Sequence, residues 1–412
     1  MRLLSSLLLL LLLGGCVRAP LVAERGDHAH DTLGTTLALP SASGPPLVWS
    51  QVTASPNPTS SSEGTRELAT NCGELDSRLT QVASWLLVRG SVVGHEDDIG
   101  LVTFLARAFG APYVGPAAWS RSSQTGSDPT DESRALSRWA MNFEPGSHLR
   151  CGLAQGDLPG RRLVIAVAAM AHADLVKPLP TTARVGQWLE FAAELHIEVS
   201  EAKVVLLGPD GDPWSVPTVR EGRLVRARFP ASRPGKWAVQ LLVNGPSGPQ
   251  QVLEALLFVD SARPTAYELE PAPGESAAAP GSVSLRESST ELLDRMVTLL
   301  RIQAGRPVLR RDPTLDRLAV AHADSMRRAS HMGHDVGNGS TTERLASAGF
   351  AARLAGENVA HATSVVRAHR ALWASPSHRS NLLNRGFSRW GLGVVADDDR
   401  SLWICELFAS ED

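Results

Sequence analysis

The sequence predicts a protein of several domains: an N-terminal α+β region, a central antiparallel β-sandwich, and a C-terminal domain of helices followed by a β-hairpin. Three observations support this prediction. The length of 412 residues exceeds that of one ordinary domain, which holds roughly 150 residues. The spacing of apolar residues changes from helical to alternating and back to helical along the chain. A stretch rich in Pro, Ala, Gly and Ser, 261–287, is expected to be a linker.

The first sixteen residues are typical of an exported protein. Arg2 provides a positive charge, residues 7–13 are all leucine, and residues 13–16 read Leu-Gly-Gly-Cys. The leucine run is too short to span a bilayer as a helix. This stretch resembles a bacterial lipobox, which implies that the signal peptide 1–15 is removed and that Cys16 is lipidated. Several acyl chains anchor a protein stably, whereas one chain binds reversibly. The alternative is a secretory signal in which Cys16 is incidental.

Residues 16–65 read as a flexible tether, because they are rich in Pro, Ser, Thr and Gly and lack sustained periodicity. Val17, and no aspartate, follows the lipidated cysteine, so we expect the anchor in the outer membrane, on its periplasmic or its surface face. The net charge is -3, with both signs interspersed and no basic block. This composition argues against a nucleic-acid partner.

Export places the remaining three cysteines in an oxidising compartment, and their number is odd. We expect a disulfide between Cys72 and Cys151, because both lie in the same predicted domain. Cys405 lies in an apolar strand and is expected to be a small buried core residue. No Cys-x-x-Cys occurs, which argues against thiol redox catalysis and a zinc ribbon.

The first folded domain is predicted at 66–175. Apolar residues recur at helical spacing in 75–87 and 99–109, and 163–170 is an apolar strand. From 178 to 260 apolar and polar residues alternate in several short segments separated by turns, which predicts an antiparallel sandwich. The segment Pro-Gly-Lys-Trp-Ala-Val at 234–239 resembles bacterial immunoglobulin-like modules. Such modules usually serve as supports, so we assign no active site here.

The C-terminal domain, 288–412, is predicted to contain four helices and a final hairpin. Ser288 with Glu291 and Ser340 with Glu343 have the spacing of capping boxes, and Asp312 precedes a proline as a helix N-cap. The predicted helices span 289–303, 313–326, 340–348 and 364–375, the last ended by Pro376, and the strands span 390–396 and 401–408.

Three potential proton carriers or metal ligands lie on separate segments of this domain: His331, Glu357 and His378. They belong to the spaced motifs Ser330-His331-Met332-Gly333, Gly356-Glu357-Asn358 and Ser375-Pro376-Ser377-His378-Arg379, which precede Gly391-Leu392-Gly393-Val394. In this order the motifs resemble the bacterial branch of the CAP superfamily, the cysteine-rich secretory proteins, antigen 5 and pathogenesis-related 1 proteins. The resemblance implies an α-β-α sandwich with a groove that holds two histidines, His331 and His378, and the acid Glu357.

The second acid of eukaryotic relatives is missing, since Trp373 is followed by Ala374, Ser375 and Pro376. This departure puts hydrolysis in doubt. His331, His378 and Glu357 would be the ligands of a Zn²⁺ ion with an open position, or Glu357 would be a base beside neutral histidines. In a purely structural alternative, these groups only satisfy loop hydrogen bonds. His334 is the alternative groove histidine, and His322 is expected to pack in the core.

The N-terminal domain has features of a degenerate copy of this domain. Gly391-Leu392 is separated by nine residues from Leu402-Trp403-Ile404, and Gly152-Leu153 by nine residues from Leu163-Val164-Ile165. Both hairpins end a region that begins with an amphipathic helix, so an ancient duplication is a hypothesis for 66–175.

The sequence thus predicts a membrane-anchored envelope lipoprotein whose CAP domain binds an extracellular or periplasmic ligand in a His/Glu groove. The ligand is a small molecule, a lipid or a protein, and no cofactor is required, with zinc as the one candidate. We expect a binding module more than an enzyme. The alternatives are a metal-assisted, protease-like hydrolase in which His331, Glu357 and His378 are catalytic, and an adhesive structural protein with a vestigial groove.

Overall fold

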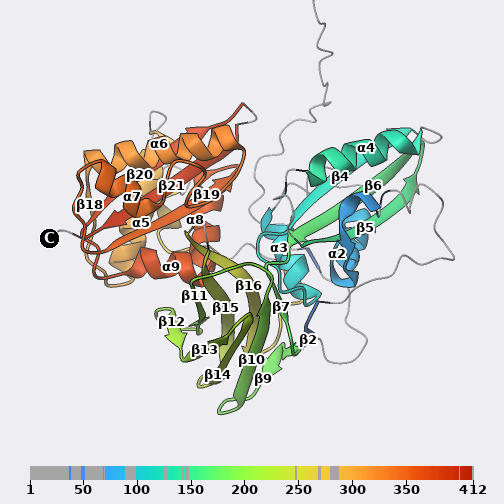
Figure 1. Cartoon of the computed structure of the whole chain (residues 1–412), viewed down its shortest axis with the longest axis horizontal. Helices are drawn as coiled ribbons and strands as arrows, with labels where there is room; N and C mark the ends of the chain where they lie inside the picture. Colours follow the sequence, from blue (N-terminus) through green and yellow to red (C-terminus); the bar gives the residue numbers. More distant parts are fainter. Residues whose placement is uncertain are drawn as a thin grey trace, which may run out of the picture.

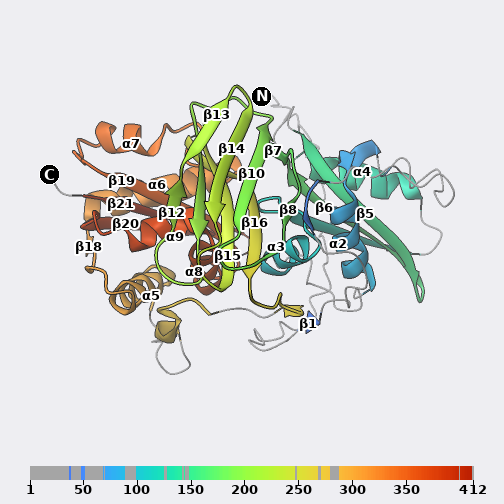
Figure 2. The same ribbon diagram turned by 90° about the horizontal axis from the view of Figure 1, so that it is seen from below.

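The computed structural model describes residues 37–38, 48–51, 68, 70–88, 99–124, 128–141, 143, 148–245, 248–267, 271–278, 287–398 and 400–410. They form an N-terminal α/β unit, a two-sheet sandwich and a C-terminal α/β domain, with the sandwich between the other two (Figure 1 and Figure 2). The predicted signal peptide and Cys16 lie outside the described residues. Within those residues, no helix is long and apolar enough to span a membrane.

The N-terminal unit is a four-stranded sheet with helices on both faces (Figure 1). Side chains of its central strand alternate, so that Ile165 and Val167 share a core with α2 and α3, whereas Val164 and Ala166 share one with α4. Burial on both faces explains the continuous apolar run in the sequence. The elements in chain order are β3 (Glu74–Leu75), α2 (Ser77–Val88), α3 (Ile99–Ala108), β4 (Ala117–Gln124), α4 (Pro129–Ala140), β5 (Leu149–Leu158) and β6 (Arg161–Met170).

The cysteines of this unit are joined. Cys72, which precedes β3, forms a disulfide with Cys151 on β5, and their Cα atoms are 5.7 Å apart. Both are fully buried in the core on the α4 side of the sheet. Cys405 of the C-terminal domain is a buried free thiol.

The central part consists of two sheets around one core. Phe191 and Phe229 from one sheet and Trp237 and Leu241 from the other are buried in this core. The strand orders are β13-β14-β10-β7 and β12-β11-β15-β16-β9, antiparallel except for β9 against β16. The strands are β7 (Ala173–Leu175), β8 (Leu179–Pro180), β9 (Thr182–Ala183), β10 (Trp188–Leu195), β11 (Glu201–Leu207), β12 (Trp214–Val216), β13 (Thr218–Glu221), β14 (Leu224–Pro230), β15 (Gly235–Gly245) and β16 (Gly248–Val259).

Part of the predicted tether belongs to the sandwich. Strand β2 (Val48–Trp49) pairs with β8, and Trp49 is buried in the sandwich core. Its indole nitrogen donates a hydrogen bond to the carbonyl of Leu256 at 2.7 Å, so both its apolar ring and its N–H are satisfied. The prediction that 48–51 is flexible is therefore wrong. Upstream, β1 (Leu37–Ala38) pairs with β17 (Ala266–Tyr267).

The C-terminal domain is a sheet of order β18-β20-β21-β19 between two helical layers. Helix α6 packs on one face with Leu407 and Trp403, and α5, α8 and α9 pack on the other with Ile404 and Phe408. The elements are α5 (Ser289–Gln303), β18 (Arg310–Arg311), α6 (Pro313–Ala329), α7 (Thr341–Ser347), β19 (Ala355–Ala362), α8 (Val365–Ala374), α9 (Pro376–Leu383), β20 (Arg389–Ala396) and β21 (Leu402–Ala409).

The predicted helix starts of this domain are confirmed. Ser288 and Ser340 each form a full capping box, and Asp312 accepts hydrogen bonds from the first backbone amides of α6. Pro376 ends α8 as expected, but it also begins α9, which the sequence analysis missed. Proline suits the first helical position because that residue needs no N–H partner.

The predicted linker 261–287 is also partly wrong. Its 3-10 helix η1 (Glu275–Ala278) places Ala277 in the core of the C-terminal domain. Arg370 of α8 donates two hydrogen bonds of 2.6 Å to Glu275. Gly274 approaches α5 so closely that a Cβ there would lie 2.0 Å from the carbonyl oxygen of Met296. Residues 271–278 therefore belong to the folded C-terminal domain.

The N-terminal and C-terminal sheets have the same connections. In each, a two-residue strand pairs in parallel with the first strand of the final hairpin, a helix follows that short strand, and the second hairpin strand pairs with an edge strand. The helix after the short strand lies equally close in both. A Cβ on Gly152 would lie 2.0 Å from Leu79 of α2, and one on Gly391 would lie 2.1 Å from Leu315 of α6.

A buried polar cluster joins α9 to the sheet. Asn358 of β19 donates to Glu406 of β21 at 2.9 Å, and Asn381 of α9 donates to Asn358 at 2.9 Å. Glu406 is fully buried, and its second oxygen has no hydrogen-bond partner among the described residues. Burial raises the pKa of Glu406 to about 7, although the hydrogen bond from Asn358 acts in the opposite direction.

Glu406→Gln should therefore change how stability depends on pH. In the wild type, stability from Glu406 is fully present below the pKa of the unfolded chain, near 4.5, and is lost as pH rises to about 7. Because the variant stays neutral, its free energy of unfolding should rise relative to that of the wild type between pH 4.5 and about 7, by roughly 3 kcal/mol at most. Urea unfolding between pH 4 and 8 measures the difference.

Glu198→Gln, at an exposed position in the sandwich, is the control and should follow the wild type throughout. A difference between Glu406→Gln and wild type that stays constant with pH would contradict the prediction.

Candidate functional site

The carboxylate of Glu357 is the centre of the candidate site. Glu357 lies on β19, the edge strand of the C-terminal sheet, and is 6 % exposed. One of its oxygens accepts a hydrogen bond of 2.8 Å from His334, and the other is ion-paired with Arg344 at the first turns of α7. The buried thiol of Cys405 lies 3.5 Å from the same oxygen as Arg344. Glu357 thus connects β19, β21, α7 and the loop 331–340.

The electrostatics of this cluster keep Glu357 ionised. Burial by itself raises the pKa of Glu357, but the hydrogen bond and charge of His334 and the charge of Arg344 outweigh it, so the pKa lies below its ordinary value. Arg344 also donates to the carbonyl oxygens of His334, at 2.7 Å, and of Gly339. The guanidinium therefore neutralises the carboxylate and holds the loop that carries His334 at two points.

The contact with Glu357 fixes the ring of His334. An ionised carboxylate only accepts hydrogen bonds, so Nδ1 of His334 must carry the proton. In the neutral ring the lone pair is then on Nε2, the nitrogen on the far side from Glu357. A carboxylate that orients a histidine in this way is a common support for metal binding and for proton transfer.

A second histidine lies behind the first. His322 of α6 is fully buried, and its Nε2 is 2.9 Å from the carbonyl of Gly333 and 3.6 Å from Glu357. Asn338 lies 3.1 Å from Nδ1. Burial lowers the pKa of His322, although the charge of Glu357 acts in the opposite direction. A neutral His322 that donates to Gly333 and accepts from Asn338 holds the loop beneath His334.

His378 forms the other side of the site, on the first turn of α9. Its Nδ1 lies 3.2 Å from the side-chain amide of Gln251, which belongs to the sandwich. Burial, and then the charge of nearby His334, lower the pKa of His378 to about 3. The ring is therefore neutral at physiological pH. We call the loop 331–340, Glu357 and the first turn of α9 together the histidine groove, after the groove that the sequence resemblance implies.

The structure brings only some of the predicted site residues together. Glu357 and His378 lie at the histidine groove, but His331 is exposed, and within the described part of the chain no hydrogen bond or ion pair joins it to Glu357. The histidine that contacts Glu357 is His334, the alternative. His322, predicted to pack only, lies within 3.6 Å of Glu357.

These positions do not fit the expected zinc ligands. Across the described residues, no three His, Cys, Asp or Glu side chains are grouped to hold a metal ion. The carboxylate of Glu357 is already neutralised by Arg344, whose positive charge disfavours a divalent cation beside it. The arrangement fits hydrogen bonding by His334 and His378 better than coordination of a metal ion.

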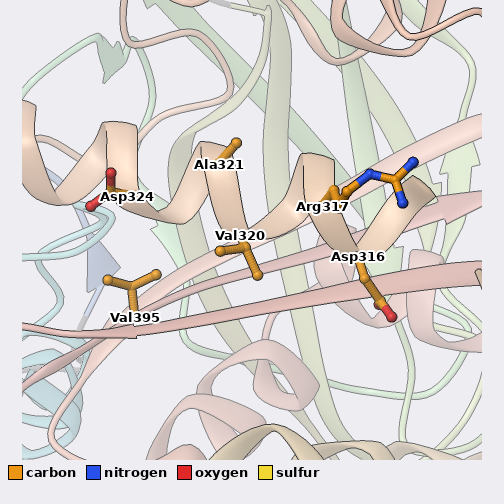
Figure 3. A pocket seen from close by; sticks show the side chains of 6 residues that line it. All are labelled: Asp316, Arg317, Val320, Ala321, Asp324 and Val395. Carbon is orange, nitrogen blue, oxygen red and sulfur yellow. The ribbon is translucent and has the colours of Figure 1, made fainter. Parts of the chain in front are cut away.

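A separate pocket of about 560 Å³ opens between α6 and β20 (Figure 3). Its lining is apolar at Val320, Ala321 and Val395 and charged at Asp316, Arg317 and Asp324. Strand β21 separates β20 from β19. The pocket is therefore not part of the histidine groove.

Comparisons with known proteins agree with this C-terminal fold. Residues 295–407 match the model of CAP, the cysteine-rich secretory protein family. No curated protein matches the chain. Among solved structures, the chain is similar to an outer surface protein from Borrelia burgdorferi, with 21% identity over 32% of this chain and 97% of that chain and a TM-score of 0.30.

Two further structures are similar over a longer part of the chain. An extracellular protein containing an SCP domain from Bacillus anthracis has 15% identity over 58% of this chain and 86% of that chain, with a TM-score of 0.28. A cysteine-rich secretory protein from Staphylococcus aureus has 11% identity over 58% and 83%, with a TM-score of 0.27. The family assignment rests on the matched model and not on these scores. The C-terminal domain of this chain is a CAP domain of the cysteine-rich secretory protein family.

Proposed function

We propose that this chain is an envelope lipoprotein whose CAP domain binds an extracellular or periplasmic ligand in the histidine groove. The observation that supports this most is the hydrogen bond from His334 to Glu357 within the buried ion pair with Arg344. It fixes one ring at the groove, and His378 adds a second ring that stays neutral. Imidazole rings held in place are suited to hydrogen bonding with a polar ligand group.

The geometry favours binding over hydrolysis. Both oxygens of Glu357 have charged or hydrogen-bonded partners, which lower its pKa and make it a weak base. No carboxylate is among the residues directly after Trp373, which are Ala374, Ser375 and Pro376, where eukaryotic relatives carry their second acid. A metal-assisted hydrolase that uses the same groove is the second candidate, and the orientation of His334 by a carboxylate is the observation that favours it.

The other parts of the chain fit a supporting role. We propose that the sandwich is an immunoglobulin-like support and that 66–175 is a degenerate CAP-like copy, based on its equivalent strand order and helix positions. The strand registers pair Glu357 with Leu407 opposite Gly391, and Ala118 with Val167 opposite Gly152. Ala118 therefore stands where the CAP domain has Glu357. A purely adhesive role for the whole chain is the remaining alternative.

We propose an anchor at Cys16, in the outer membrane. The support is the sequence alone: a charged start, seven leucines and Leu-Gly-Gly-Cys. Several acyl chains on one cysteine would hold the folded domains at the membrane surface.

Binding at the histidine groove should depend on His334 and not on His331. The full chain is incubated with a lipid extract of the envelope and, separately, with a peptide library, and bound species are identified by mass spectrometry. The amount of bound species should be at least roughly tenfold lower with His334→Ala than with the wild type, because a fixed hydrogen-bonding ring is removed. His331→Ala, at an exposed position of the same loop, is the matched control and should retain it.

Equal retention by both variants, or no retained species with the wild type, would contradict the proposed binding site.

Zinc titration distinguishes a ligand-binding protein from a metal-assisted hydrolase. We expect no one-to-one uptake of Zn²⁺ by calorimetry at neutral pH, because Arg344 already neutralises Glu357. A metal-assisted hydrolase should bind Zn²⁺ and cleave peptides. His378→Ala should then lose Zn²⁺ uptake, and Glu357→Gln should lose peptide cleavage. Observing both losses would overturn the proposal that the groove only binds a ligand.

The anchor is tested by partition between detergent and water. Cys16→Ser should move the protein, expressed in a bacterial host, from the detergent phase of a Triton X-114 extract to the aqueous phase, because the acyl chains are no longer attached. Ser43→Ala, in the same N-terminal segment, should remain in the detergent phase. Detergent partition of Cys16→Ser would show that the sulfur of Cys16 does not carry the anchor.

A further inference from the structure

The β15–β16 hairpin of the sandwich ends against the histidine groove. Gly248, the first residue of β16, lies so near the loop 331–340 that a Cβ on it would be 3.4 Å from the Cβ of His334. Its φ of 99° is a conformation that residues with a side chain rarely adopt. Figure 1 shows the upper ends of these strands meeting the layer of α9. The backbone of the sandwich thus reaches the histidine that Glu357 orients.

One side chain of the same strand spans the other side of the groove. The amide nitrogen of Gln251 lies 2.7 Å from the hydroxyl of Ser375 and 3.2 Å from Nδ1 of His378, and it also donates to Ser377. Two amide hydrogens are therefore shared among three acceptors in the first turn of α9. Strand β16 therefore contacts His378 through Gln251 and passes close to His334 at Gly248.

The sandwich also completes the N-terminus of α9. Ser375 occupies the N-cap position but makes no capping hydrogen bond with its own side chain. Instead, the backbone N–H of Ser377 donates to the side-chain oxygen of Gln240 on β15, at 3.2 Å. The first amides of a helix have no partner inside the helix and need one from elsewhere. Here a different domain provides it, which marks the contact as a built interface.

The glutamines are in turn held from the opposite side. Gln240 is fully buried and donates to Gln251 at 2.7 Å and to Glu254 at 3.0 Å. Glu254 is ion-paired with Arg107 of α3, and its backbone N–H donates to the carbonyl of Pro112 at 3.0 Å. A continuous set of polar contacts therefore runs from the N-terminal unit through the hairpin to α9. The orientation of Gln251 is fixed by these contacts.

Hydrogen bonds and an ion pair join the sandwich to the CAP domain. Besides the glutamines, Arg306, which follows α5, is ion-paired with Asp212 of the sandwich. Polar groups at an interface exchange their partners for water at small net cost. Polar interfaces between domains of one chain therefore permit relative motion of the domains.

We propose that the β15–β16 hairpin is a built-in cover of the histidine groove, so that a ligand reaches His334 and His378 only after the sandwich and the CAP domain separate at Gly248 and Gln251. The identity of the groove as a ligand site rests on the proposed function. The cover itself rests only on the contacts described here. The ligand and the hairpin would then compete for the same residues, and the apparent affinity for the ligand would fall as the hairpin contact becomes more stable.

Chemical labelling of His378 tests the cover without any ligand. The full chain is treated with diethyl pyrocarbonate, which modifies accessible imidazoles, and the rate at each histidine is read by peptide mass spectrometry. Gln251→Ala should label His378 roughly tenfold faster than wild type, because several interdomain hydrogen bonds are lost. Gln250→Ala, the neighbouring glutamine whose amide lies against Gly245, should match the wild type. The exposed His331 should be labelled at the same rate in all three.

A disulfide across the interface should hold the sandwich and the CAP domain together, whereas Gln251→Ala weakens their contact. A Cβ built on Gly248 would lie 3.4 Å from that of His334, close to the separation in natural disulfides, so Gly248→Cys with His334→Cys is oxidised with copper phenanthroline. The strain of a side chain at the positive φ of Gly248 is common to the oxidised and the reduced form. In the oxidised form, labelling of His378 should fall at least roughly tenfold below the reduced form. The single variant Gly248→Cys, treated with the same reductant, controls for reduction of the disulfide between Cys72 and Cys151.

Equal labelling of Gln251→Ala and Gln250→Ala, or equal labelling of the oxidised and reduced double variant, would overturn the cover. Thermal unfolding of Gln251→Ala shows whether the sandwich remains folded, and the double variant keeps the test decisive if it does not. Because no ligand is used, failure of the cover leaves the proposed binding function standing. Failure to find a ligand likewise leaves the cover standing.

Discussion

The rest of the CAP domain site depends on one buried charge. A carboxylate that is 6 % exposed needs a positive charge and hydrogen bonds, and Glu357 obtains them from Arg344 and His334. Each partner has a second task, since Arg344 also binds the carbonyls of the loop 331–340, and His334 presents its other nitrogen away from the carboxylate. The position of the loop, the tautomer of His334 and the charge of the site therefore follow from the need to compensate Glu357.

Local signals in the sequence predicted much of this fold correctly. The capping boxes at Ser288 and Ser340 and the N-cap at Asp312 depend on neighbours three residues away, so they could be recognised without the fold. The choice between His331 and His334 could not be made this way. It depends on which ring the loop turns toward Glu357, and that turn is set by Arg344, which carried no signal of its own in the sequence.

Two misplaced boundaries have a common cause. Trp49 and Ala277 lie in stretches whose composition is that of a tether and a linker, yet each fills a core of a domain further along the chain. Composition reports whether a segment can build its own core, not whether a single side chain completes that of another segment. The repeated strand order was only hinted at by the two hairpins, because β4 pairs with β6 as β19 pairs with β21 but has Ala118 at the position of Glu357.

The amide of Ser377, bonded to Gln240 of another domain, has a consequence for any shortened form of this protein. Cut at the linker, the CAP domain would keep its sheet and its buried Glu357, but the start of α9 would lose its external cap, and His378 would face water in place of Gln251. Such a fragment would present the first turn of α9 without the sandwich residues that contact it in the full chain. Any ligand of the proposed groove would therefore meet different surroundings at His378 in a fragment than in the whole protein.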